Sequence, residues 1–323
     1  MTKLKALLIL STVSSTVGLS LVSGDMASAG ATTSNNIEIV SLHRYAVKGL
    51  NFDALPAVEF PERGATFPDD RRFALLWDDG RDFQPREWMH KENFLCAFTA
   101  PQLLSRLESS YEIIADESQE STEKRLIIRD RKSQEVLLPP TDLSNEGGRR
   151  ALASFLSDYS GRKVQCVTNC PPSLKVHNFQ FGNTSSGVKK NQGDTRTIHI
   201  INQNTIDDVQ SKLQLDLLHA TRFRPNIVLR GPPAWSEFEW VNDQRELQVV
   251  HSNNPTTNPL RLRMIQRTVR CDGVSVDPLD PDTILDIPQL LAKHFPEHGP
   301  YLGVYATVEN PGSLSVGNQL QLV

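Results

Sequence analysis

Apolar and polar residues alternate along most of the chain, a spacing that is typical of β-strands. In the first half this alternation predicts strands at residues 37–42 and 72–77, and the second of these runs into the hairpin-turn sequence Asp78-Asp79-Gly80. Residues 125–128 and 135–138 flank a polar turn and predict a second hairpin. The first half therefore predicts a small antiparallel barrel or sheet.

The second half combines strands with helices. Apolar residues spaced three and four apart predict helices at residues 147–160, 204–213 and 287–294. Residues 161–193 are rich in turn residues and are predicted to be mostly loop. Strands are predicted at residues 197–201, 224–231, 261–269, 274–276, 302–309 and 319–323, with a turn at 310–312 between the last two.

These elements predict an α+β fold that is mostly β. We divide the chain into a signal or anchor segment with its linker at residues 1–36, an antiparallel β-barrel-like domain at 37–165, and a second domain of strands and helices at 166–323. A length of 323 residues suits one large or two ordinary domains and can bury a substantial core.

Charge and composition exclude one class of partner. The formal net charge is −4, and no basic run or basic patch interleaved with aromatic residues occurs. Such a chain offers nucleic acid no general attraction, so we expect no nucleic-acid partner.

The four cysteines are too few for a disulfide scaffold. Cys166 and Cys170 are three residues apart and are followed by two prolines; they could pair or stay free, and we expect them to be free. No second ligand pair at zinc-finger spacing accompanies them. Cys96 lies in an apolar segment, Phe94–Phe98, and is predicted to be core.

The fourth cysteine carries the chemistry. Cys271 follows Arg267 and Arg270, and the alternation of Val274 and Val276 predicts a strand leaving it. Cationic neighbours favour a thiolate, which acts either as a nucleophile or as a soft metal ligand. A buried structural cysteine beside surface arginines is the plainer interpretation of this segment taken alone.

Four stretches of the sequence, in this order, resemble the MOSC-domain proteins, among them molybdenum cofactor sulfurases and mitochondrial amidoxime-reducing components. Residues 45–48, Tyr-Ala-Val-Lys, resemble the entry of the family's N-terminal barrel. Residues 223–228, Phe-Arg-Pro-Asn-Ile-Val, resemble its arginine-proline-asparagine motif. Arg270-Cys271 with Val-Asp-Pro at 276–278 resembles its cysteine segment, and residues 309–317 resemble its closing hairpin. The resemblance spans roughly residues 37–323, and it implies that the domain at 166–323 is a MOSC β-barrel with peripheral helices.

The resemblance implies a site for molybdenum held by a pterin. It makes Cys271 the metal ligand and catalytic residue. The residues that it implies for binding the rest of the cofactor are Lys48, Arg72, Asp194, Thr195, Arg224 and Asn226. Two departures weaken the match at its start: Gly49 replaces a serine and Ala46 replaces a proline. Arg86 resembles a further family arginine, with poorly matching neighbours.

The activity implied is a molybdenum-dependent reduction of small N-hydroxylated substrates, with electrons from an external donor protein that resembles cytochrome b5. We expect neither the pyridoxal-phosphate domain nor the iron–sulfur domain that some relatives add. The alternative function is a non-catalytic carrier or sulfur-transfer module for the sulfurated cofactor, and a third is a degenerate scaffold that binds nothing. Sequence does not separate these alternatives, because the first two need the same cavity.

The first thirty residues fit two different targeting segments. An apolar run ends at Val22 and an Ala-Ser-Ala site follows at 27–29, as in a secretory signal; Asn183-Thr-Ser185 would then be a glycosylation acceptor. Residues 4–22 are also nearly long enough to span a bilayer. The implied cofactor is inserted into folded protein inside the cell, and the twin-arginine signal for exporting folded proteins is absent. We therefore expect a retained membrane anchor with the domain in the cytosol, as on the mitochondrial outer membrane.

Overall fold

The computed structural model describes residues 36–82, 88–115, 122–169, 181, 197–250 and 259–323. Residues from Asn35 to Val323 form one compact unit. The strands are β1 (Ile37–Arg44), β2 (Asp53–Leu55), β3 (Ala57–Phe60), β4 (Phe73–Trp77), β5 (Phe94–Leu95), β6 (Leu107–Ala115), β7 (Thr122–Asp130), β8 (Val136–Asp142), β9 (Val164–Thr168), β10 (Ile198–Asn202), β11 (Ile227–Arg230), β12 (Glu246–Val250), β13 (Arg261–Val269), β14 (Tyr301–Asn310), β15 (Gly312–Ser315) and β16 (Gln319–Leu322). The α-helices are α1 (Pro101–Ser105), α2 (Glu146–Ser160), α3 (Gln203–Lys212), α4 (Ser236–Asn242) and α5 (Ile287–His294). Short 3₁₀ turns lie at Lys91–Asn93 (η1), Ala220–Phe223 (η2) and Asp272–Val274 (η3).

Seven strands close into a barrel in the order β11, β10, β14, β13, β12, β16, β1, because β1 pairs with both β16 and β11. Its only parallel pair among the described strands is β10 with β11. Nearly every residue of β10 and β14 is buried, since one face of each strand lies inside the barrel and helices cover the other. The prediction of a mostly β, α+β fold with barrel strands and peripheral helices is confirmed.

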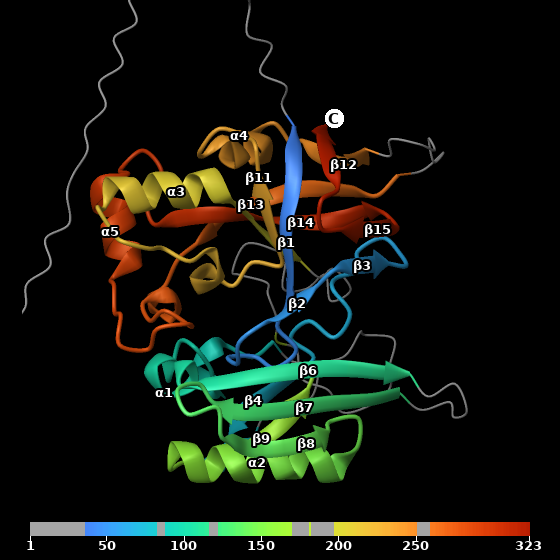
Figure 1. Cartoon of the computed structure of the whole chain (residues 1–323), viewed down its shortest axis with the longest axis vertical. Helices are drawn as coiled ribbons and strands as arrows, with labels where there is room; N and C mark the ends of the chain where they lie inside the picture. Colours follow the sequence, from blue (N-terminus) through green and yellow to red (C-terminus); the bar gives the residue numbers. More distant parts are fainter. Residues whose placement is uncertain (1–35, 83–87, 116–121, 170–180, 182–196, 251–258) are drawn as a thin grey trace, which may run out of the picture. The chain divides into compact units, whose positions relative to one another are not determined.

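Strand β2 extends the barrel sheet by pairing with β1, and the remaining strands form smaller sheets. One has the order β5, β4, β9 and another the order β6, β7, β8, with α2 packed against β8 and β9 (Figure 1). Leu152 and Leu156 of α2 are fully buried in the core that these sheets share. This part of the chain is joined to the barrel twice: β1 closes the barrel, and β3 pairs with β15. The division at residue 165 stays a prediction.

The predicted helices at 147–160, 204–213 and 287–294 are present as α2, α3 and α5. Each buries part of the apolar stripe that gave the helical spacing: Ile206 and Val209 in α3 and Leu291 in α5 are buried, whereas Leu213 and Leu290 are only partly buried. No helix among the described residues is long and apolar enough to cross a membrane. The predicted anchor at residues 1–30 lies outside the described residues, as does Asn183.

Three local predictions were wrong, and a fourth was incomplete. Strand β4 pairs with β5 and β9 and forms no tight hairpin across Asp78–Gly80. The segment 161–193, predicted to be mostly loop, contains the strand β9, which completes that sheet; residues 170–180 and 182–193 lie outside the described residues, so the rest of this prediction stays a prediction. Residues 310–312 lead into β15, which pairs with β3 before the chain reaches β16. The strand predicted at 274–276 is absent: Val274 ends η3, where its amide donates back to the carbonyl of Cys271 at 3.1 Å, and Val276 forms only an isolated bridge to Ile284.

Candidate functional site

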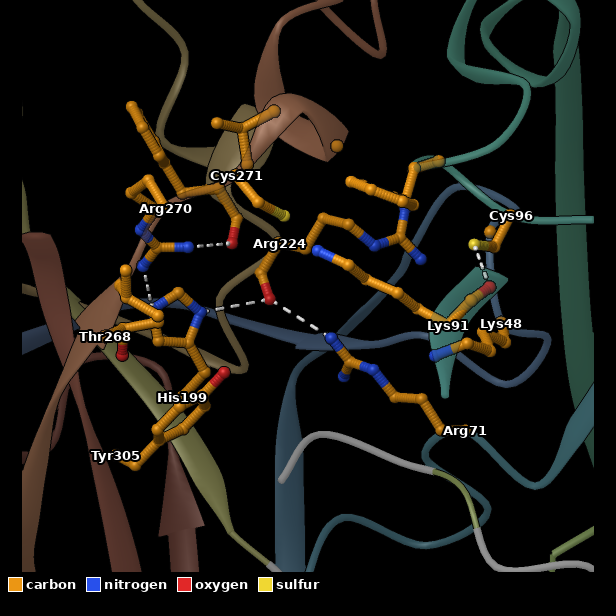
Figure 2. A pocket seen from close by; sticks show the side chains of 17 residues that line it. Lys48, Arg71, Lys91, Cys96, His199, Arg224, Thr268, Arg270, Cys271 and Tyr305 are labelled. Carbon is orange, nitrogen blue, oxygen red and sulfur yellow. Dashed lines mark hydrogen bonds between the residues drawn. The ribbon is translucent and has the colours of Figure 1, made fainter. Parts of the chain in front are cut away.

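A cavity of about 190 Å³ lies where the loops after β1 and β5 meet the barrel strands β10, β13 and β14 (Figure 2). Its described lining is drawn from segments far apart in the sequence. The lining residues are Lys48, Gly49, Arg71, Lys91, Cys96, Ala97, Phe98, His199, Phe223, Arg224, Thr268, Val269, Arg270, Cys271, Gly273, Val274 and Tyr305.

The lining carries five cationic side chains and, among the described residues, no carboxylate. The cations are Lys48, Arg71, Lys91, Arg224 and Arg270. Burial lowers the pKa of Lys48, and the neighbouring cations Arg71, Arg224 and Lys91 lower it further. Burial also lowers the pKa of Arg224 to about 10, so this side chain stays charged at neutral pH. Positive charge gathered in a buried space favours an anionic ligand.

Each of the five cations lies over an aromatic ring. Arg71 and Arg224 lie 4.4 and 4.3 Å from the centroid of Tyr45. The other three pairs are Lys48 over Phe94 at 5.5 Å, Lys91 over Phe98 at 3.7 Å and Arg270 over Phe223 at 5.3 Å. An aromatic face holds a cation by its quadrupole and adds no negative charge. The rings therefore help to position the cations without neutralising their charge, although Arg71 is also paired with the carboxylate of Asp70.

The two arginines over Tyr45 are held by further contacts. Arg71 forms an ion pair with Asp70 at 2.6 Å and donates to the Arg224 carbonyl at 3.2 Å. The Arg224 guanidinium donates to the Leu50 carbonyl at 2.8 Å. Arg71 and Arg224 have φ angles of +48° and +57°, a left-handed backbone that costs about 1–2 kcal/mol in a residue with a side chain. The surrounding contacts offset that strain and fix both arginines at the cavity.

Steric crowding explains why position 49 is a glycine. Its φ is +100°, and a Cβ there would lie 2.7 Å from the Cα of Cys96. The close approach of the segment after β5 therefore excludes the serine that the family resemblance leads one to expect.

Cys271 follows the end of β13 and its free thiol is half-buried. In Figure 2 its sulfur points into the space that the ends of Lys91 and Arg224 approach. Arg270 lines the same cavity, whereas Arg267 lies over the ring of Phe238 at 4.4 Å and does not line it. No group of three or more His, Cys, Asp or Glu side chains in the described part of the chain could hold a metal ion.

The sequence-based candidates separate into three groups. Lys48, Arg224 and Cys271 lie together in the cavity. Arg72 and Asn226 do not line it: Arg72 donates to the Asn169 carbonyl, and the buried Asn226 has its own set of contacts. Its amide oxygen accepts from the His199 backbone at 3.1 Å and its amide nitrogen donates to the His43 carbonyl at 3.1 Å, which links β10 to β1. Asp194, Thr195 and Arg86 lie outside the described residues.

Sequence reasoning missed several lining residues, chiefly Arg71, Lys91, Cys96, His199 and Tyr305. A signal existed for two of them. Arg71 is the neighbour of the chosen Arg72, and His199 is a polar residue within an otherwise apolar strand. Cys96 was predicted to be core; it is 4% exposed and also borders the cavity.

The cysteines outside the cavity add little. Cys166 on β9 is free, and burial raises the pKa of its thiol to about 12. Cys170 lies outside the described residues, so the prediction that its thiol is also free stays a prediction.

Residues 187–321, which include Arg224, Arg270 and Cys271, match the family model of the MOSC domain. The chain contains a MOSC domain. Lys48, Arg71 and Lys91 precede the matched residues, so the segment before the MOSC domain supplies three of the five cavity cations.

Two curated proteins are similar to this chain. Mitochondrial amidoxime-reducing component 1 from Homo sapiens is 28% identical over 140 residues, which cover 40% of this chain and 38% of that protein. Mitochondrial amidoxime reducing component 2 from Rattus norvegicus is 30% identical over 172 residues, which cover 52% and 49%. The match thus spans half or less of the length of these relatives. A crystal structure of the YUAD protein from Bacillus subtilis aligns over 89% of this chain and 95% of that chain, at 8% identity and a TM-score of 0.36.

Proposed function

We propose that this MOSC protein binds a molybdenum cofactor and reduces small N-hydroxylated substrates. The observation that carries the proposal is a single cavity with five cations, no carboxylate among its described lining residues, and one half-buried free thiol. Two relatives named as amidoxime-reducing components support the substrate class.

The residues present fit such a group. A pterin cofactor carries a phosphate, for which Lys48, Arg71 and Arg224 supply charge-assisted hydrogen-bond donors. Cys271 supplies the soft ligand that a metal held by sulfur favours. Asp194 and Thr195 belong to the proposed site by resemblance alone. Arg72 and Asn226 would act beside it, Asn226 by holding β10 to β1.

When bound, the cofactor supplies the two-electron redox chemistry. The chain's own part is to hold and orient it. The aromatic-supported cations neutralise the ligand's charge, and Lys91, whose ammonium approaches the space in front of Cys271, would meet a polar substrate group there (Figure 2). We propose that electrons come from a separate protein that resembles cytochrome b5.

The alternative is a carrier or sulfur-transfer module, which the free and half-buried thiol of Cys271 also suits. A carrier would hand its cofactor to an acceptor protein and would not turn over substrate. Reductase assay with a small amidoxime and a chemical reductant separates the two functions.

Metal analysis tests the proposal first. Protein purified from a host that makes the cofactor should contain molybdenum and a pterin, and should reduce the amidoxime. Replacing Arg224 by glutamine should strongly lower the molybdenum content, whereas Arg267→Gln, an arginine outside the cavity, should keep it. A folded preparation with no molybdenum, or equal loss in both variants, would overturn the proposal.

The segment before residue 36 is proposed to anchor the protein in a membrane with the domain in the cytosol, as the mitochondrial names of both relatives suggest. Sequencing the mature N-terminus and fractionating cells would test this. A secreted form that begins at Gly30 would contradict it.

A further inference from the structure

His199 is a polar side chain placed inside the barrel wall. It lies on β10 between apolar residues, is 2% exposed, and its ring contacts Tyr305 at a centroid distance of 5.5 Å. The neighbouring strand β14 makes room for it. Gly303 has φ of +73°, and a Cβ there would lie 2.9 Å from His199 Nε2 and 2.7 Å from the Ile200 carbonyl oxygen.

The two ring nitrogens reach two different groups. Arg270 Nη2 lies 2.5 Å from His199 Nε2, and His199 Nδ1 lies 3.2 Å from the Arg224 carbonyl oxygen. A guanidinium has no acceptor, so Nε2 must accept and Nδ1 must carry the hydrogen that it donates. The ring is therefore neutral, in agreement with a pKa that burial and the Arg270 charge hold well below the usual range.

Each end of this bridge leads to a functional part of the cavity. The Arg224 carbonyl that accepts from His199 also accepts from Arg71, so this one oxygen connects the imidazole to both arginines that lie over Tyr45. Arg270, at the other end, donates to the carbonyls of Leu302 and Phe223 and immediately precedes Cys271. Figure 2 shows the imidazole between the two groups, with a hydrogen bond on either side.

We propose that His199 is a positioning residue that holds the anion-binding arginines and Cys271 at a fixed spacing across the cavity, an inference that rests on the proposed function. A ligand with a phosphate at one end and a metal at the other needs both ends of its site at a set separation. Binding geometry of this kind depends on side chains whose orientation is locked by buried hydrogen bonds.

Two amide substitutions separate the two halves of the bridge. In His199→Asn the amide nitrogen lies near the position of Nδ1, so a donor to the Arg224 carbonyl remains and the acceptor for Arg270 is lost. In His199→Gln the longer side chain places its amide oxygen near Nε2, so the acceptor remains and the donor is lost. His199→Leu removes both.

The readouts use the cofactor-free full-length protein. Calorimetry measures its affinity for inorganic pyrophosphate, which reports on the arginines. The rate at which iodoacetamide alkylates Cys271, followed by mass spectrometry of the Cys271 peptide, reports on the thiol. We expect His199→Gln to lower pyrophosphate affinity at least tenfold with the alkylation rate within twofold of wild type. We expect His199→Asn to change the alkylation rate at least threefold with affinity within twofold, and His199→Leu to change both.

Ile201→Val, which removes one methyl group from the same buried strand, is the matched control and should change neither readout. Arg270→Lys tests the bridge from its other end: it removes the guanidinium that donates to His199 Nε2 and should change the alkylation rate of Cys271 at least threefold, which keeps the proposal testable if the histidine variants do not fold. Equal effects in the asparagine and glutamine variants, or no effect in either, would overturn the proposal. Failure of the proposed function looks different: the wild-type protein would bind neither pyrophosphate nor molybdenum, while Cys271 alkylation would still differ between the two amide variants.

Discussion

At the scale of single residues, a substitution at Cys271 tests the proposed function most directly. Cys271→Ser replaces a soft thiolate ligand by a hydroxyl that is far less readily deprotonated. We expect reductase activity to be lost while the unfolding midpoint and the pyrophosphate affinity stay close to wild type. Cys166→Ser, at a cysteine on β9 outside the cavity, should be tolerated. Full activity of the Cys271 variant would place the metal ligand elsewhere.

Tyr45 is buried between Arg71 and Arg224, and its hydroxyl has no hydrogen-bond partner among the described residues. Tyr45→Phe keeps the ring and removes that buried, unpaired group, so we expect stability to be unchanged or up to about 1 kcal/mol higher. Tyr45→Leu removes the aromatic face and leaves a cavity, which should cost about 2–4 kcal/mol and weaken pyrophosphate binding. Chemical denaturation and calorimetry measure both effects. Equal pyrophosphate affinity in the two variants would show that the ring does not position the arginines.

Glu237 on α4 is fully buried, and its described partners, Thr205 and Asn202, are neutral. Burial raises the pKa of this carboxyl to about 7, above the value near 4.5 of an unfolded glutamate. The folded state therefore holds the proton more tightly than the unfolded state. Burying the charged carboxylate lowers the free energy of unfolding. This loss is absent below about pH 4.5, grows as the pH rises towards 7 and is complete above pH 7. Its upper bound is about 3 kcal/mol.

Glu237→Gln should therefore be more stable than wild type at pH 8.5, and the difference should shrink as the pH is lowered to 5. Denaturant unfolding at both values measures it. Glu239→Gln, at an exposed position of the same helix, is the control and should alter stability little at either pH. A constant difference between Glu237→Gln and wild type across this range would rule out the buried charge as its cause.

At the scale of elements, periodicity located α2, α3 and α5, because each has an apolar face that must be buried, but it missed the short helices α1 and α4. It failed where pairing or a local turn decided the structure. Strand β9 lacks a clear pattern and forms because β4 offers it an edge. After Cys271 the valines suggested a strand, but Gly273 packs against the segment at Ala97 and Phe98, and the chain turns as η3. Neither partner is visible in the local sequence.

Gly49 allows a test of such a close approach. Gly49→Ser meets both a positive φ and a contact of 2.7 Å with the Cys96 backbone, so we expect a loss of about 2–4 kcal/mol and weaker pyrophosphate binding. Gly80→Ser is the control: φ there is +79°, but a Cβ meets nothing within 4 Å. Its cost should be confined to backbone strain, about 1–2 kcal/mol. Equal losses in thermal or chemical denaturation would show that the contact with Cys96 can relax.

At the scale of the whole molecule, the candidate site could be predicted in part. The motifs singled out Lys48, Arg224 and Cys271, which lie far apart in the sequence and share one cavity in the structure. They could not choose between Arg71 and Arg72, because that choice depends on the left-handed backbone at Arg71, nor find Lys91, which reaches the cavity from the 3₁₀ turn before β5. Residues brought together only by the closure of the barrel leave no local signal.

Because β1 closes the barrel, we predict that the MOSC segment, residues 166–323, needs the residues before it in order to fold and to form the site. A chain of residues 166–323 alone lacks β1, so β11 and β16 would each lose a paired edge, and it also lacks Lys48, Arg71 and Lys91. Unpaired strand edges favour aggregation, and removal of Ile37, Ile39 and Leu42 opens the barrel core. We expect this fragment to be insoluble or to lack a cooperative unfolding transition, and to bind no pyrophosphate. A chain of residues 36–323 should unfold cooperatively and bind pyrophosphate. Adding a peptide of residues 36–45 should restore part of the fold but not the binding, since the three cations stay absent. A soluble fragment 166–323 that unfolds cooperatively and binds pyrophosphate would show that the barrel closes, and the site forms, without β1.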